Sequence, residues 1–164
     1  MFTVACRNKA TLEQQQKGQA IVNSHLINVN KIITQKESQE IDNYIASHHW
    51  EMKKTGTGLR YSIYNLKSSG PNPENGSVVN IRSTISLLNG TVCYSGQSNK
   101  VKSYQLGKGE LTNGMEEALK MMRPGEKAKL VMPSHLAFGL TGDGNEIPTK
   151  SPLVCDLELI SIRN

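Results

Sequence analysis

Histidine and cysteine are the side chains here most able to do chemistry, and neither type is spaced for it. His25, His48, His49 and His135 have no partners at the spacing of a metal site or a catalytic triad. Neither a serine nor a cysteine stands in the strand-to-helix turn that activates a nucleophile. We therefore expect a chain that uses no metal, no cofactor and no covalent intermediate.

The remaining short motifs exclude further classes of protein. Cys6, Cys93 and Cys155 are too few for a disulfide scaffold and lack the close pairing of a zinc site. The glycines between Gly139 and Gly144 do not have the spacing of a phosphate loop, and no Lys-Ser or Lys-Thr pair follows them. Nucleotide binding is therefore not expected.

Cys6 is a candidate for lipidation. Residues 2–5, Phe-Thr-Val-Ala, lead into it like the end of a lipoprotein signal, although the hydrophobic region that should precede them is missing. Either the start codon is placed too late and residues 1–10 are a truncated signal, or the match is chance and they are a flexible terminus. The first alternative, which we favour, predicts a membrane-anchored protein of the cell envelope or periplasm, and the second a cytoplasmic one.

Length and charge limit the number of domains and the classes of binding partner that we expect. The 164 residues suffice for one globular domain with an appendage. The formal charge is +5, but lysine and arginine are scattered among acidic residues without the clustering that nucleic-acid binding needs. No stretch approaches the roughly 20 apolar residues of a spanning helix.

Residues 11–54 are expected to form a helical arm. Thr11 begins a capping box, and apolar residues at helical spacing predict a helix over residues 12–33, with a break possible at 27–34. Thr34 is expected to cap a second helix that reaches about His49. The apolar stripe must pack on the domain that follows or on the same arm of a second chain, so a homodimer is one possibility.

Residues 55–164 are expected to form an α+β domain. Alternating apolar residues predict strands, Asn89-Gly90 is typical of a tight hairpin turn, and one short helix stands between strands. This order predicts an antiparallel twisted sheet wrapped on one helix. The expected strands cover residues 59–64, 79–87, 91–94, 127–132 and 153–162, and the expected helix covers 113–121.

A series of motifs over about two thirds of the chain resembles one known family, the FKBP-type peptidyl-prolyl cis-trans isomerases. They occur in the order and with the gaps of that family. The matching segments are Gly56–Tyr61, Leu88–Val92, Leu106–Glu110, Gly114–Met121, Pro124–Ala128, Pro133–Gly139, Ile147-Pro148 and Leu153–Leu159. Residues 85–95 and 133–143 further resemble the gliding-motility-associated lipoprotein branch of Bacteroidetes, which agrees with a lipid on Cys6.

The resemblance implies an FKBP-like fold and an isomerase acting on proline-containing segments of unfolded or exported proteins. Rotation of the X-Pro amide must overcome a barrier of ~18–20 kcal/mol. A dry apolar cup that holds the proline ring and favours the twisted amide lowers this barrier without a nucleophile.

Several residues depart from the family's pocket. Met115 stands where the family has a floor tryptophan, and Phe138 stands where it has a tyrosine that donates to the substrate carbonyl. Tyr94 replaces a polar aspartate, and Lys102 falls near an aromatic position. The resemblance thus implies Phe138, Tyr94 and Met115 as catalytic residues.

Six further residues are implied as substrate contacts. Ser83 replaces a wall tyrosine, and Cys93 and Cys155 replace phenylalanines. These two cysteines face each other across the family's pocket, where they are either bonded or two buried thiols. The full set of implied substrate contacts is Ser83, Cys93, Leu111, Thr112, Ile147 and Cys155.

Three functions follow from these departures. The chain is a weak isomerase that assists the folding of exported or envelope proteins, or a non-catalytic peptide-binding or chaperone module, or a structural subunit of an envelope complex anchored through Cys6. A proline-peptide assay separates the first from the second.

Overall fold

The computed structural model describes residues 19, 29–65, 70–95 and 100–163. The chain divides into two compact units, Met1–Gln39 and Glu40–Asn164. Residues 40–54, which the sequence analysis assigned to the arm, lie in the second unit. Cys6, the cap at Thr11 and most of the expected helix over residues 12–33 lie outside the described residues.

Residues 29–47 are helical throughout. The Thr34 hydroxyl donates to the carbonyl oxygen of Asn30 at 2.9 Å, one helical turn earlier. The prediction that a second helix begins at Thr34 is therefore wrong. Residues 29–34 contain no break of the kind that the sequence left open. The β-branched residues there lower helix stability by only tenths of a kcal/mol each, roughly 0.5 kcal/mol at most, which does not interrupt a helix. No helix within the described residues is long and apolar enough to cross a bilayer.

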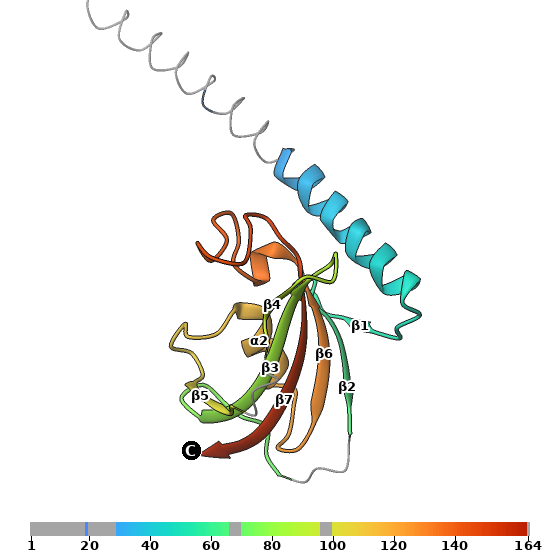
Figure 1. Ribbon diagram of the computed structural model, residues 1–164. Helices are drawn as coiled ribbons and strands as arrows, with labels where there is room; N and C mark the ends of the chain where they lie inside the picture. The colour runs from blue at the N-terminus through green and yellow to red at the C-terminus, as the bar shows by residue number, and fades with distance from the viewer. Residues whose placement is uncertain (1–18, 20–28, 66–69, 96–99, 164) are drawn as a thin grey trace, which may run out of the picture. The chain divides into compact units, whose positions relative to one another are not determined.

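The second unit is built on an antiparallel sheet that has seven strands among the described residues. The strand order is β1-β2-β6-β7-β3-β4, and β5 pairs with β3. The strands are β1 (Lys53–Lys54), β2 (Arg60–Tyr64), β3 (Val78–Leu87), β4 (Val92–Tyr94), β5 (Lys102–Gln105), β6 (Lys127–Met132) and β7 (Leu153–Arg163), shown in Figure 1. The helix α2 (Asn113–Leu119) and the short 3-10 helix η2 (Ser134–Leu136) complete the unit.

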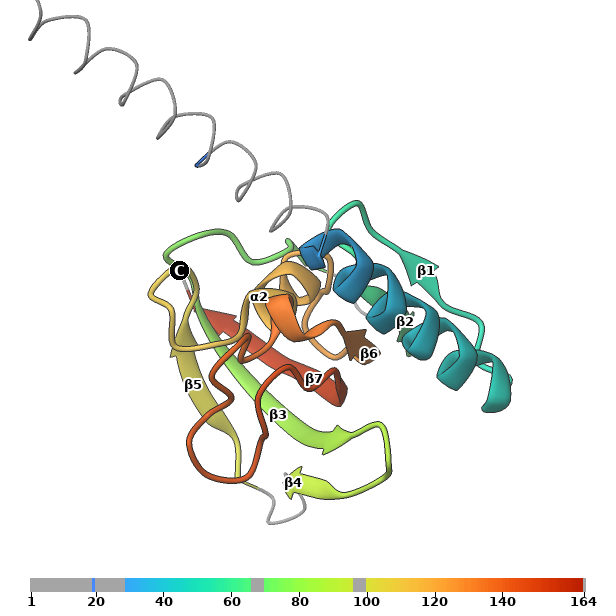
Figure 2. The same cartoon turned by 90° about the horizontal axis from the view of Figure 1, so that it is seen from above.

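The core lies between the sheet and α2, which Figure 2 shows against one face of the curved strands. Alternate residues of β7 point into it, as the sequence predicted, because side chains of a strand alternate between its faces. Leu153, Cys155, Leu157 and Leu159 are almost fully buried, while Asp156 between them is exposed. The predicted fold, an antiparallel sheet wrapped on one short helix with an N-terminal helix, is confirmed.

The opposite face of the sheet is covered by residues of the helix that belong to this unit. Ile41 packs on Val131 of β6 and Val154 of β7, which share a face because they are register partners. Tyr44, Ile45, Trp50, Met52 and Leu88 pack around this cluster. Both faces of β6 and β7 are buried in this region. These strands therefore carry consecutive apolar residues here, and apolar and polar residues do not strictly alternate.

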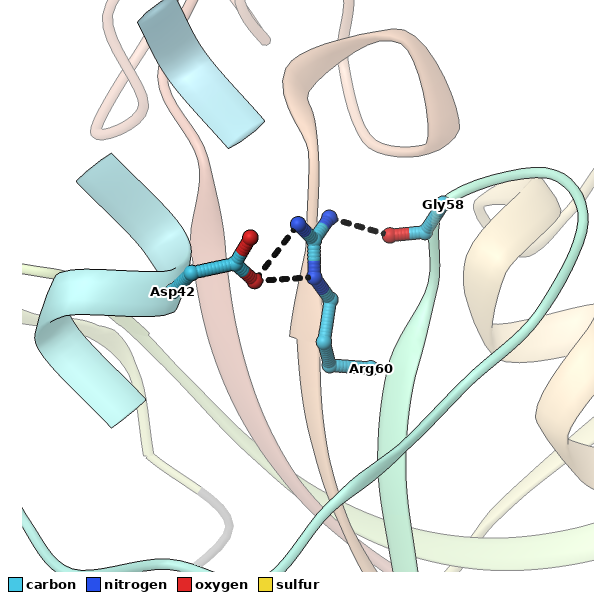
Figure 3. A network of polar contacts seen from close by, with 3 residues as sticks. All are labelled: Asp42, Gly58 and Arg60. Carbon is cyan, nitrogen blue, oxygen red and sulfur yellow. Dashed lines mark hydrogen bonds and ion pairs between the residues drawn. The ribbon is translucent and has the colours of Figure 1, made fainter. Parts of the chain in front are cut away.

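An ion pair fixes this covering segment in place (Figure 3). Arg60 of β2 is only 3% exposed and donates from Nη2 and Nε to the Asp42 Oδ1 at 2.7 and 3.0 Å. Its Nη1 donates to the Gly58 carbonyl oxygen at 2.7 Å. A buried guanidinium is costly without such partners, so Asp42 both neutralises Arg60 and positions its own helical turn.

Candidate active site

A cavity of about 460 Å³ opens on the side of the sheet that carries α2. It brings together six of the residues that the resemblance implied: Ser83, Tyr94, Leu111, Thr112, Met115 and Phe138. Ile81, Ile85, Ser95, Lys100, Lys102, Tyr104 and Glu110 also line it. Residues from the three strands β3, β4 and β5, from the adjoining loops and from the start of α2 therefore meet at one site.

The base of the cavity is apolar. Ile81 and Ile85 stand two positions either side of Ser83 on β3, so all three face the same way. Met115, in the first turn of α2, is 3% exposed and belongs to the core at the same time as it lines the cavity. An unbranched thioether side chain adapts to irregular shapes, which gives this site a soft floor in place of a rigid aromatic one.

The start of α2 forms one wall. Thr112 is the N-cap, with its Oγ1 accepting a hydrogen bond from the Met115 backbone at 3.4 Å. Glu116 Oε1 accepts from the Gly107 backbone at 3.1 Å, and Glu110 Oε2 accepts from the Gln105 backbone at 3.0 Å. These two carboxylates hold the turn between β5 and α2, and so fix the wall relative to the strand.

Tyr94 lines a second side of the cavity, and its contact with Asp143 behind it was not predicted from the sequence. The Tyr94 hydroxyl donates to Asp143 Oδ2, while Asp143 Oδ1 accepts from the backbones of Asn145 at 3.0 Å and Ile147 at 2.8 Å. The Tyr94 hydrogen bond lowers the pKa of the Asp143 carboxyl and raises the pKa of the Tyr94 phenol. This contact links β4 to the loop that carries Phe138.

That loop is held tightly at both ends. The Gly139 backbone donates to the Ser134 carbonyl at 2.8 Å, and the Lys150 backbone donates to the Gly139 carbonyl at 2.9 Å. Gly142 has a φ of +69°, and a Cβ there would lie 2.2 Å from the Ile147 carbonyl oxygen, so only glycine fits. Phe138 is thereby presented at the cavity by a fixed backbone.

Three of the implied substrate contacts do not line this cavity. Cys155 is fully buried in β7, and burial raises the pKa of its thiol to about 12. Cys93 on β4 is half-buried, with Sγ 3.7 Å from the Glu146 carbonyl oxygen, and burial raises its pKa as well. Ile147 is 3% exposed and packs in the core. Both cysteines are free thiols, and the substrate-binding roles of all three residues stay predictions.

The described lining of the cavity combines apolar side chains with hydroxyl groups. Its described lining includes hydroxyls of Ser83, Ser95 and Thr112 but no histidine or cysteine. An apolar base beneath the aromatic rings of Tyr94, Tyr104 and Phe138 suits a small apolar ring, and the polar rim suits the peptide on either side of it.

The family model for FKBP-type peptidyl-prolyl cis-trans isomerases matches residues 70–160, more than half of the chain. The chain belongs to this family. The FKBP match covers the whole cavity lining from Ile81 to Phe138.

Individual relatives agree with this assignment. The FKBP-type peptidyl-prolyl cis-trans isomerase FkpA of Buchnera aphidicola is 33% identical over 70% of this chain and 46% of its own length. The macrophage infectivity potentiator of Trypanosoma cruzi is 41% identical over 48% of this chain and 39% of its own length. The chain thus spans less than half of these two curated relatives.

The crystal structure of FkpA from Escherichia coli is similar to this chain over a larger share of its residues than these two relatives. It has a TM-score of 0.68 and 26% sequence identity, covering 93% of this chain and 71% of that one.

Proposed function

We propose that this chain accelerates cis/trans isomerisation of X-Pro peptide bonds. The observation that carries the proposal is the apolar base formed by Ile81, Ile85 and Met115 at the cavity of an FKBP fold. The proline ring enters this base, and the amide loses its solvating water there. Loss of that water favours the twisted amide, whose conjugation is broken, over the planar one.

The proposed activity is weak, because Phe138 supplies an aromatic face without a hydroxyl. A hydroxyl at this position would bind the substrate carbonyl and orient the amide, and Phe138 cannot make that contact. Ser83 lies on the same face of β3 as the isoleucines and offers a hydroxyl in this part of the cavity. We propose that the Ser83 hydroxyl donates a hydrogen bond to the carbonyl oxygen of the bound peptide.

The test is equilibrium exchange NMR on a short Leu-Pro peptide. Phe138→Tyr is expected to raise the catalysed exchange rate about tenfold by a hydrogen bond that orients the substrate carbonyl, and Phe138→Ala to lower it by a similar factor through loss of the ring contact. Met115→Leu keeps the volume of the floor and is expected to change the rate less than threefold. Tyr64→Ala, an exposed aromatic on β2 outside this cavity, is the matched control.

A non-catalytic peptide-binding or chaperone module is the second candidate. The missing hydroxyl at Phe138 favours it, since an apolar cavity binds proline segments without a donor. Exchange that stays at background in the folded protein and in Phe138→Tyr, together with suppressed aggregation of an unfolded client, would establish this alternative.

The location of the protein in the cell is a separate proposal. We place the protein in the cell envelope, as a folding factor or a structural subunit of an envelope complex in the gliding-motility-associated lipoprotein branch. The sequence of residues 2–6 supports a lipid on Cys6. Mass spectrometry of the N-terminal peptide from native membranes would show the mass of a diacylglycerol on Cys6, and an unmodified thiol there would contradict the anchor.

Dimerisation through the helical arm is supported by an exposed apolar stripe. Val29, Ile32 and Ile33 are 38%, 53% and 40% exposed and recur at the spacing of one helix face. Light scattering of the full chain tests this proposal, and a monomer at all concentrations would contradict it.

A further inference from the structure

A row of side chains from the β5 segment points into the cavity. Lys100, Lys102 and Tyr104 stand two residues apart and all three line it. Lys102 is the register partner of Ile81, so the ammonium-bearing side chain and the apolar base share one face of the sheet. Ser103, between them, turns the other way and donates its hydroxyl to Asn80.

Both lysines carry charge at the rim of an apolar site. Each is exposed, and within the described residues no ion pair joins either one to a carboxylate. Glu110 is the one carboxylate in the described lining, and its Oε2 is held by the Gln105 backbone at the turn. The rim therefore has an excess of positive charge close to the place where a peptide must pass.

We propose that Lys102, supported by Lys100, makes the cavity select X-Pro segments with an aspartate or glutamate next to the proline. This inference rests on the proposed function. When the proline ring packs on Ile81, the peptide residues on either side of the proline lie at the rim of the cavity. The flexible side chain of Lys102, which is directly across the strand pair from Ile81, can reach them there. A carboxylate there gains an ion pair whose surroundings are partly desolvated, while a basic residue is repelled.

The experiment compares peptides that differ in one side chain next to proline. Ala-Xaa-Pro-Ala and Ala-Ala-Pro-Xaa series, with Xaa as Glu, Gln or Lys, cover both neighbours of the ring. Exchange NMR gives the catalysed rate, and chemical-shift titration gives the affinity of each peptide. A Leu-Pro peptide reports the activity that does not depend on charge.

In at least one series, Glu is expected to exceed Lys about twofold to fivefold at low salt, a size typical of exposed ion pairs. The ratio should approach one in 1 M salt, where screening acts within about 3 Å. Lys102→Gln should remove most of the preference, and Lys102→Glu should reverse it. Lys53→Gln, on β1 at the far end of the sheet order, makes the same charge change and should leave the ratio unchanged.

Each outcome separates this inference from the proposed function. Catalysis of Leu-Pro with equal rates and affinities for Glu and Lys peptides overturns the lysine selection and leaves the isomerase standing. Absence of all catalysis, with Glu peptides still binding more tightly through Lys102, supports the selection and moves it to a binding module. If the protein shows no catalysis and binds Glu and Lys peptides equally, both the proposed function and the lysine selection are overturned.

Discussion

Tyr94 and Asp143 show how this site has been rebuilt at the level of single residues. Tyr94 comes from β4 and lines the cavity, Asp143 comes from the loop after η2, and their hydrogen bond joins these two elements. The carboxylate also receives two backbone hydrogen bonds from its own loop. One acidic residue therefore both shapes the loop and holds it to the strand.

The sign of the two pKa shifts defines the pH window of this contact. The pKa of Asp143 is lowered from its ordinary value of 3.8, so its contribution is present above that pH and is lost as pH falls through the lower folded value. The pKa of Tyr94 is raised from 10.0, so its contribution is present below pH 10 and is lost as pH rises through the higher folded value. The contact therefore persists from about pH 4 to pH 10.

Tyr94→Phe is expected to raise the pKa of Asp143 toward its ordinary value, since it removes the largest cause of the shift. The carboxyl carbon resonance of Asp143, followed by NMR from pH 2 to pH 7, measures this directly. Tyr64→Phe is the matched control and should not move it. An unchanged midpoint in Tyr94→Phe would show that the backbone donors alone set the pKa.

The resemblance located six of the thirteen residues that line the cavity but could not supply their partners. Ser83, Leu111 and Met115 were predicted from the resemblance, and the fold brings them together at the cavity. Tyr94 and Asp143 are 49 residues apart, and no apolar period or short motif connects such a pair. Cys93 and Cys155 align with pocket positions, but a thiol is shorter than a phenylalanine ring and neither lines the cavity.

At the scale of elements, the Arg60–Asp42 pair decides how the helical residues 40–47 cover the sheet. The Arg60 side chain is 4% exposed, whereas that of Asp42 is 49% exposed. The Lys129–Asp156 pair offers a matched comparison, because Asp156 is also 49% exposed while its partner Lys129 is 27% exposed. The two carboxylates differ mainly in the burial of the cation that they neutralise.

Asp42→Asn is expected to lower the free energy of unfolding by about 1–3 kcal/mol, because it leaves a buried guanidinium without its charge partner. Asp156→Asn should cost less than about 1 kcal/mol, as for exposed ion pairs. Urea denaturation of both variants at pH 7 measures the difference. Equal losses would mean that Arg60 finds compensation from Gly58 or from solvent.

The predictability of each element follows from its length and apolar content. β3, β6 and β7 are long, carry period-two apolar patterns and were predicted close to their observed bounds. β1 has two residues, both lysines, and β5 has the sequence Lys-Ser-Tyr-Gln, so neither has an apolar pattern to detect. Such strands form because a neighbouring strand offers a free edge, and sequence periodicity does not contain that information.

At the scale of the whole molecule, residues 40–54 determine where the chain can be divided. They contribute Ile41, Tyr44, Ile45, Trp50 and Met52 to the cluster on the outer face of β6 and β7. Without them Val131 and Val154 would face water, and Arg60 would lose Asp42. We propose residue 40 as the boundary of the unit that folds on its own.

A chain of residues 40–164 is expected to unfold at the same urea concentration as the full chain, within error. A chain of residues 55–164 should lose about 3–6 kcal/mol, from the exposure of this cluster and the unpaired arginine. Chemical denaturation followed by far-UV circular dichroism compares the three. Equal stability of the two truncated chains would place the boundary at residue 55, as the sequence motifs suggested.

The buried thiol of Cys155 has a consequence for oxidation chemistry. Burial raises the pKa of this thiol to about 12, so very little of it is ionised at pH 7, and the thiolate is the form that attacks oxidants and disulfides. The strand that carries it is paired on both sides, by β3 and β6, so reagents reach the sulfur only when the sheet opens. The Cys155 thiol in the core of the folded domain is thus expected to stay unchanged in oxidising and reducing surroundings alike. The rate at which Cys155 is alkylated then reports the rate of global unfolding.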